Sequence, residues 1–262
     1  MFKFKKNVVY LLCIGLSLIL SSAFVHADDD DENGVSGELE IYFSNKFIEE
    51  GESEIPGRAV MTPELEIEFE GLNIGDFEVP SFFIEAEMAI AESENLRESE
   101  VSIGKEWEFN NFSMALGYTW VYEDEEEEGE EEEGEGEEDP NDHEFFLGLS
   151  CEECLPFEIV PNLSYVHSTE ADGGMVEIEL AREIEMERFS IEPYVGALID
   201  FGYVNDEYDG LNNILVGVAV SIPLTDAISL GAYATHSFAE ENLRREGHDD
   251  QTWGGIGLEF EL

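Results

Sequence analysis

The chain has 262 residues, enough for one large β domain or two small ones, and carries 64 acidic against 11 basic residues. Its formal net charge of −53 argues against nucleic acid as a partner, because the phosphates would be repelled. After the N-terminal segment no stretch approaches about 18 uninterrupted apolar residues, so we expect no transmembrane helix there. An acidic proteome adapted to salt is an alternative source of the charge.

The first 27 residues have the three parts of a secretory signal peptide. Three early lysines precede an apolar stretch from 8 to 24, and Val25-His26-Ala27 places small residues before a cleavage point. We predict cleavage after Ala27, with a retained membrane anchor as the alternative. The mature chain, 28–262, then keeps 8 basic and 64 acidic residues, a net charge of −56.

The segment TPELEIEFEG, residues 62–71, alternates glutamates with Leu65, Ile67 and Phe69. Strand side chains alternate between two faces, so this segment forms a strand with one acidic and one apolar face. A helix would scatter the same residues around its circumference. The same reasoning predicts twelve strands, at 36–44, 62–72, 79–91, 100–110, 112–122, 143–151, 156–167, 174–186, 188–201, 213–222, 227–238 and 251–262.

The connections between these strands alternate in length. Long connections fall at 45–61, 92–99, 123–142, 168–173, 202–212 and 239–250. The others are tight turns, at 73–78, 110–111, 152–155, 187 and 223–226. Long loops at one end and short turns at the other are typical of outer-membrane barrels, and an even strand number places both termini at the short-turn, periplasmic end.

The longest loop contains EDEEEEGEEEEGEGEED, residues 123–139, in which every residue is acidic or glycine. Like-charge repulsion and the absence of apolar residues predict a disordered, solvated extracellular loop over 123–142. A calcium site is the alternative, but the loop lacks the spacing of an EF-hand. Loose condensation of cations is the simpler interpretation.

The less acidic strands indicate which face meets lipid. One face of 112–122, 213–222 and 227–238 carries mostly small neutral residues, which suit a confined lumen, and the opposite face of the first two is bulky. Tryptophan and tyrosine lie near strand ends, as at membrane interfaces. We therefore predict an all-β fold, a transmembrane antiparallel up-and-down barrel in the outer membrane with lipid on its apolar face. Ordinary aromatic packing in a soluble core is the alternative.

In this arrangement the glutamates of the alternating strands line the lumen. So many carboxylates require water and counter-cations inside, and twelve strands should leave a narrow channel. The predicted pore-lining residues are Glu38, Glu40, Glu64, Glu66, Glu68, Glu70, Glu85, Glu87, Glu106, Glu108, Glu177, Glu179, Glu259 and Glu261.

The motif CEEC, residues 151–154, falls at a predicted periplasmic turn. A β-turn brings its first and fourth residues close enough for a disulfide, and the periplasm is oxidising. We predict a structural disulfide between Cys151 and Cys154. The alternatives are a thioredoxin-type redox motif, which requires a helix, and a zinc site, which requires nearby histidine.

Four mature histidines, His143, His167, His236 and His248, fall near the predicted extracellular rim. The first three share parity with lipid-facing residues, so we expect contacts with headgroups and no metal site. His167-Ser168 and His236-Ser237 do not form nucleophile–base pairs, because adjacent strand residues point to opposite faces. We therefore expect neither enzyme activity nor a cofactor.

The last segment, WGGIGLEFEL (253–262), resembles the C-terminal strand by which the assembly machinery recognises bacterial outer-membrane barrels. The layout of YFSNKFIEEG (42–51) followed by MTPELEIEFEGL (61–72) is similar to the small porins of the TorF type, although the arginine of that family's loop motif is missing. The resemblance covers most of the mature chain and implies a pore without naming its solute.

We therefore expect a narrow passive channel of a Gram-negative outer membrane that prefers small cations and contacts outer-membrane lipid. Two alternatives stay open. One is a structural or adhesive barrel with a closed lumen, and the other is a soluble periplasmic barrel that binds apolar ligands. Single-channel conductance distinguishes a pore from a plugged barrel, and fractionation tests the soluble alternative.

Overall fold

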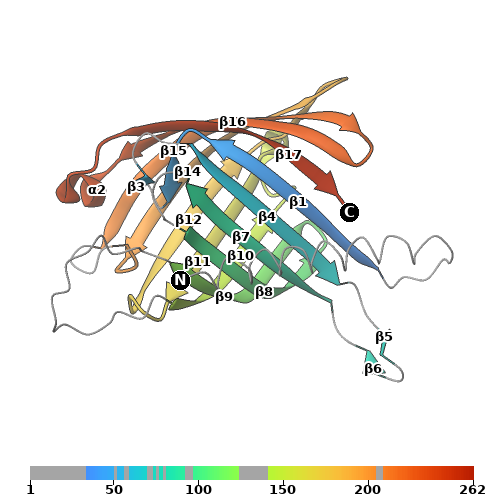
Figure 1. Ribbon diagram of the computed structural model, residues 1–262, viewed down its shortest axis with the longest axis horizontal. Coiled ribbons are helices and arrows are strands. Elements are labelled where there is room, and N and C mark those ends of the chain that lie inside the picture. The colour runs from blue at the N-terminus through green and yellow to red at the C-terminus, as the bar shows by residue number, and fades with distance from the viewer. Residues whose placement is uncertain are drawn as a thin grey trace.

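The structure is a computed structural model that describes residues 34–49, 52–55, 59–69, 73–74, 77–78, 81–91, 97–123, 141–204 and 209–262. The predicted signal peptide, Glu70 and the acidic stretch 124–140 lie outside the described residues. In Figure 1 the barrel lies on its side, with α2 at one end and the C-terminus at the other.

The alternating segments form long antiparallel strands, because this pattern gives each strand one face for the interior and one for the outside. The predicted fold class is confirmed: twelve strands form one closed barrel. They are β1 (Val35–Ser44), β4 (Val60–Phe69), β7 (Phe82–Ala91), β8 (Arg97–Phe109), β9 (Phe112–Glu123), β10 (Asn141–Cys151), β11 (Val160–Ser168), β12 (Gly173–Ala181), β14 (Ser190–Phe201), β15 (Gly210–Thr225), β16 (Ile228–Ala239) and β17 (Gln251–Glu261).

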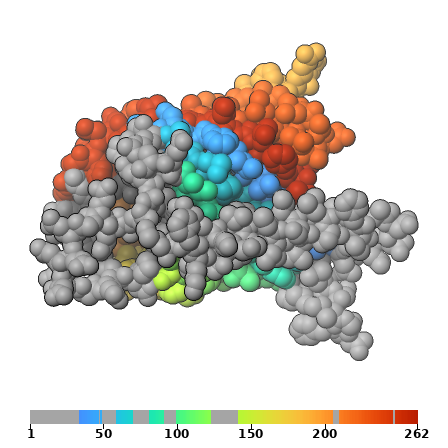
Figure 2. Space-filling view, in the orientation of Figure 1, coloured from blue at the N-terminus to red at the C-terminus, as the bar shows by residue number. Residues whose placement is uncertain are grey.

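The first and last strands close the barrel. β1 pairs antiparallel with β17 as well as with β4, so Glu38 faces Glu261 on one side and Glu66 on the other. Figure 2 shows this junction as the line where the blue and red surfaces meet. β12 pairs directly with β14, which completes the ring of strands. A closed ring removes exposed sheet edges, the condition for crossing a bilayer with strands.

Several connections contain small elements that the sequence analysis missed. The long connection after β1 holds the hairpin β2 (Phe47–Glu49) and β3 (Glu52–Ile55), and the one after β16 holds helix α2 (Glu241–Glu246). At the opposite end lie β5 (Asn73–Ile74), β6 (Phe77–Glu78), the 3-10 turn η1 (Pro156–Glu158) and β13 (Ile184–Glu185). The single-residue turn predicted at Glu187 is wrong: β12 ends at Ala181, and β13 folds back on β14.

Large apolar side chains cover the outside of the barrel. Phe43, Phe109, Phe145 and Leu116 are all more than half exposed, and Ile256 is 62% exposed. A water-soluble protein does not leave so many large apolar groups in contact with solvent, and a contiguous apolar surface of this kind indicates an interaction with membrane or protein. Within the described ranges, no helix is both long enough and apolar enough to cross a membrane.

Cys151 ends β10, and the turn after it pairs Cys151 with Cys154 in a disulfide, with Cα atoms 5.6 Å apart. Glu152 N donates to Asn111 O at 3.0 Å, and Asn111 Nδ2 donates to Glu153 Oε2 at 2.7 Å. These hydrogen bonds hold the turn against the neighbouring β8–β9 turn.

Replacing Cys151 and Cys154 with serine is expected to leave barrel assembly intact. The disulfide closes a very short loop, so its entropic contribution is smaller than the roughly 3 kcal/mol expected for a loop of about 15 residues. Mass spectrometry of the purified protein before and after reduction measures the linkage. Two free thiols in unreduced protein would contradict the disulfide.

Candidate functional site: the barrel interior

Side chains that reach past a whole strand identify the inner face of the barrel. The rings of Phe83 on β7 and Phe146 on β10 have centroids 6.1 Å apart, although β8 and β9 lie between their strands. Ser221 on β15 donates to Glu259 Oε2 on β17 at 3.2 Å, past β16. Such contacts form only on the concave side, so these four residues point inward.

The strand register arranges inward glutamates in two rows that cross neighbouring strands. The row nearer the long-loop end, called the upper row, has five carboxylates on five consecutive strands: Glu259, Glu40, Glu64, Glu87 and Glu100. The lower row has four on four strands: Glu261, Glu38, Glu66 and Glu85. Together the two rows make one acidic wall, formed by β17, β1, β4, β7 and β8.

The other predicted positions lie beside this wall or on a separate one. Glu68 pairs with Ser36, whose hydroxyl donates to Glu68 Oε2 at 3.2 Å. Glu106 and Glu108 lie lower on β8, opposite Ala115 and Ser113 of β9. Further inward-facing acidic residues were missed by the sequence analysis because they fall near strand ends or on less acidic strands: Glu100, Glu144, Glu192 and Asp200.

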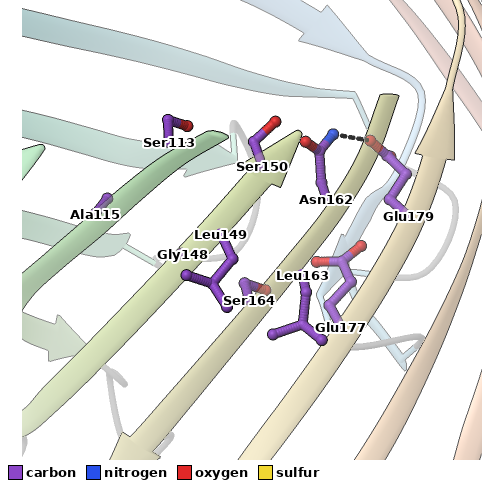
Figure 3. Close-up of a pocket in the computed structure, with 10 residues that line it drawn as sticks. All are labelled: Ser113, Ala115, Gly148, Leu149, Ser150, Asn162, Leu163, Ser164, Glu177 and Glu179. Carbon is purple, nitrogen blue, oxygen red and sulfur yellow. Dashed lines mark hydrogen bonds between the residues drawn. The ribbon is translucent and has the colours of Figure 1, made fainter. Parts of the chain in front are cut away.

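Predicted residues Glu177 and Glu179 lie on β12, where they border a cavity of about 330 Å³ on the inner side of β9–β12. Figure 3 shows the polar and apolar side chains that line it, among which Asn162 Nδ2 donates to Glu179 Oε1 at 3.3 Å. Small side chains at Ser113, Ala115, Gly148, Ser150 and Ser164 leave this space open.

The described basic side chains lie away from the inner face of the barrel strands. Five of them belong to connections: Lys46, Arg182, Arg188, Arg244 and Arg245. Lys105 has outward parity on β8. The carboxylates of the acidic wall therefore have no described cationic side chain beside them within the barrel.

Tyrosine side chains lie beside part of the acidic wall. These tyrosine contacts were not predicted from the sequence. Tyr42 OH donates to Glu259 Oε1, and the Tyr42 and Tyr233 rings have centroids 5.7 Å apart. Tyr233 OH lies 2.5 Å from Ser44 Oγ. Tyr42 shares the parity of the inward glutamates, but nothing in the linear pattern indicates which side chain its hydroxyl meets.

The residues directly after β14, from Gly202 to Val204, fold inward at the long-loop end. Tyr203 OH donates to Glu144 Oε1 on β10, and the backbone N–H groups of Tyr203 and Val204 donate to Asp200 Oδ1 at 2.8 and 3.0 Å. A Cβ on Gly173 would overlap the carbonyl oxygen of Gly202. This segment therefore lies directly on the inner side of β12 and narrows the barrel there.

Helix α2 also lies at the long-loop end, where it packs against β15 and β16. Leu243 and Asn242 are buried, and Glu240 N donates to Asn212 O at 2.9 Å. Arg244 fixes the connection by donating to Ala239 O at 2.7 Å and to Asp250 Oδ1 at 2.8 Å.

Changing Tyr203 to phenylalanine is expected to loosen the segment that follows β14. The change removes a hydrogen bond to a carboxylate, worth about 1.5–3 kcal/mol, and keeps the ring. Hydrogen exchange should become faster at the amides of Tyr203 and Val204, whereas the β14 amides keep their protection. Unchanged exchange at both amides would contradict the contribution of the Glu144 contact.

The histidines lie on the outer face or in connections. His143 Nδ1 lies 2.5 Å from Tyr118 OH, and His236 Nδ1 lies 2.6 Å from Thr252 Oγ1, both between outward-facing side chains. Ser168 and Ser237 have the opposite, inward parity. In the part of the chain that the structure describes, no group of three or more His, Cys, Asp or Glu side chains is arranged to hold a metal ion.

No protein-family model matches the chain, and no curated protein is significantly similar in sequence. Among solved structures, the KdgM porin has a TM-score of 0.51 and 12% identity over 86% of this chain and 99% of its own. Its complex with disordered oligogalacturonate has a TM-score of 0.50 and 12% identity over 87% of this chain and 99% of its own. The NanC porin has a TM-score of 0.52 and 10% identity over 86% of this chain and all of its own.

The similarity to these three structures establishes the fold and leaves the finer resemblance to TorF-type porins a prediction. Because the barrel is closed, its outer surface is apolar and its similar structures are porins, the chain has the fold of outer-membrane porins, in agreement with the outer-membrane location expected from the sequence.

Proposed function

We propose that the protein is a narrow passive outer-membrane channel that prefers cations. The observation that carries this proposal is the acidic wall, nine carboxylates in two rows on the inner face. Rings of acidic side chains concentrate cations and repel anions in a pore. The described basic side chains lie elsewhere, so mobile cations are left to balance this charge.

The electrostatics of neighbouring carboxylates support a wet interior. Residues paired across antiparallel strands have Cβ atoms about 5 Å apart, as for Glu40 with Glu64 and Glu64 with Glu87. Two unit charges at that separation repel by roughly 3 kcal/mol at an effective dielectric constant near 20, and by less than about 1 kcal/mol in water. A dry, packed interior would not hold so many adjacent carboxylates, so water and counter-cations are part of the proposal.

The charge of the interior also argues for a solute different from that of one similar structure. The KdgM porin has been solved in complex with oligogalacturonate, a chain of carboxylate-bearing sugars. The acidic wall of this chain would repel such a polyanion. We therefore propose small cations as the permeating solutes here, although the fold is shared.

A closed structural or adhesive barrel is the second candidate, and the long-loop end supports it. The segment that carries Tyr203 lies on the inner side of β12, and α2 packs at the same end. These contacts narrow the mouth. The soluble alternative that binds apolar ligands is disfavoured, because the large apolar side chains of the strands lie outside and the glutamates inside.

Single-channel recording of the refolded, full-length mature chain in planar lipid bilayers distinguishes the two candidates. A channel gives discrete conductance steps that persist in potassium chloride and shrink when a bulky organic cation replaces potassium. A protein that inserts, migrates as a folded barrel on cold gels and yet gives no steps would instead support the plugged barrel.

A further inference from the structure

Lys105 is a charged residue in an apolar environment on the outside of the barrel. It lies on β8 between outward-facing Ile103 and Trp107, and its register partner on β9 is Leu116. Ile103 and Leu116 are each 51% exposed, which places Lys105 within the apolar surface. On β8 from Ser99 to Phe109 and on the other eleven barrel strands, Lys105 is the one outward-facing described residue with a formal charge.

A charged lysine side chain in the hydrocarbon region of a membrane has a free-energy cost. Extending the ammonium group to the membrane interface lowers that cost. β8 ends four residues later at Phe109, followed by the Asn110–Asn111 turn. At about 3.3 Å per residue and a strand tilt near 40°, Lys105 lies roughly 10 Å from that turn along the barrel axis. The short-turn end, and therefore the periplasmic leaflet, is within reach of its side chain.

The contact with Trp107 indicates the direction that the side chain takes. Lys105 Nζ lies 5.3 Å from the Trp107 ring centroid, and Trp107 is two residues nearer the short turn. Tryptophan prefers the interface, where its ring packs against lipid and its N–H meets the polar layer. The ammonium group therefore leans towards the phosphate layer and is steadied there by the ring.

We propose that Lys105 and Trp107 form a binding site for the phosphate of a glycerophospholipid in the periplasmic leaflet. The ammonium group donates to the phosphate oxygens, Trp107 packs beside the headgroup, and Ile103 and Leu116 contact the acyl chain. This inference rests on the outer-membrane placement and does not depend on ion conduction.

A carboxylate from a second copy of the chain would be the other possible partner for Lys105. The described outer faces of the barrel strands offer no such group, because their glutamates and aspartates all have inward parity. Two barrels packed side by side through these faces would leave the lysine unpaired. A lipid phosphate is present all around the barrel at the required depth, so the observations favour the lipid.

The test is native mass spectrometry of the full-length mature barrel in a neutral detergent, with phosphatidylglycerol added. Lys105→Met removes the charge and is compatible with an apolar surface, and Lys105→Arg keeps it. Lys46→Met is the matched control, because Lys46 lies in the connection after β1 and donates to Gln251 Oε1 at 2.8 Å. Cold-gel migration first establishes that each variant is folded.

Lys105→Met should bind phosphatidylglycerol about fivefold more weakly than the unchanged protein, the factor that corresponds to about 1 kcal/mol for one lysine near a charged surface. Lys105→Arg and Lys46→Met should bind as the unchanged protein does. With a diacylglycerol of the same acyl chains, which has no phosphate, all four proteins should bind alike.

Equal binding of phosphatidylglycerol by Lys105→Met and the unchanged protein would overturn the proposal. A difference that persists with diacylglycerol would overturn the phosphate assignment, and loss of a dimer peak in Lys105→Met without loss of lipid would identify a second copy as the partner. Conductance is measured on the same samples, so failure of the lipid-site proposal is distinguished from failure of the channel proposal.

Discussion

Changing Glu40, Glu64 and Glu87 together to glutamine should lower the cation preference severalfold and leave the barrel folded. The three residues are consecutive in the upper row, so the change removes the centre of the acidic wall. Glutamine is nearly isosteric with glutamate and is compatible with a wet interior. The change also relieves like-charge repulsion, so the free energy of unfolding should stay equal or rise.

The measurement is the reversal potential in a salt gradient, recorded at low and at high ionic strength. The difference from the unchanged protein should be largest at low ionic strength, where screening is weakest. The matched control changes Glu152, Glu153 and Glu187 to glutamine, because these exposed residues lie in short connections outside the barrel. An equal effect of both triple variants would mean that overall charge, and not the acidic wall, sets the preference.

Replacing Val218 with lysine should cost about 2–4 kcal/mol of stability in lipid, the range for a lysine near the bilayer midplane on the lipid face of a barrel. Val218 lies near the middle of β15, points outward and is 37% exposed. Its register partners are Pro193 and Ala234, so no carboxylate is paired with the new charge.

The control for this experiment is the next residue along the same strand. Ala219 faces inward opposite Glu192, so Ala219→Lys meets water and a carboxylate and should cost less than about 1 kcal/mol. Urea unfolding in lipid vesicles, followed by tryptophan fluorescence, gives both values. Equal costs for the two variants would contradict the assignment of the outer face to lipid.

The alternating pattern explains why so much of the fold could be predicted. In a strand the side-chain period is two, so Glu64, Glu66 and Glu68 share a face whatever their neighbours are. One buried or lipid-facing side then fixes the register strongly, and the predicted strand boundaries differ from β1, β9 and β17 by one residue at most. The alternation of long and short connections then predicted the barrel topology, and the count of alternating segments predicted the strand number.

Contacts between distant segments could not be predicted in this way. The pattern does not say that Glu40 lies between Glu259 and Glu64. Tyr203 meets Glu144 because a connection folds back into the barrel, and Phe83 meets Phe146 because Gly104 and Gly117 leave room for their rings. These contacts depend on barrel curvature, which a linear pattern does not contain.

The central claim is that the nine inward carboxylates make the barrel a cation channel. The most direct measurement is the reversal potential of the unchanged protein in a bilayer separating two concentrations of potassium chloride. The account predicts discrete conductance and a reversal potential with the sign expected for potassium. A reversal potential with the sign expected for chloride, or an inserted, folded barrel that passes no current, would contradict it.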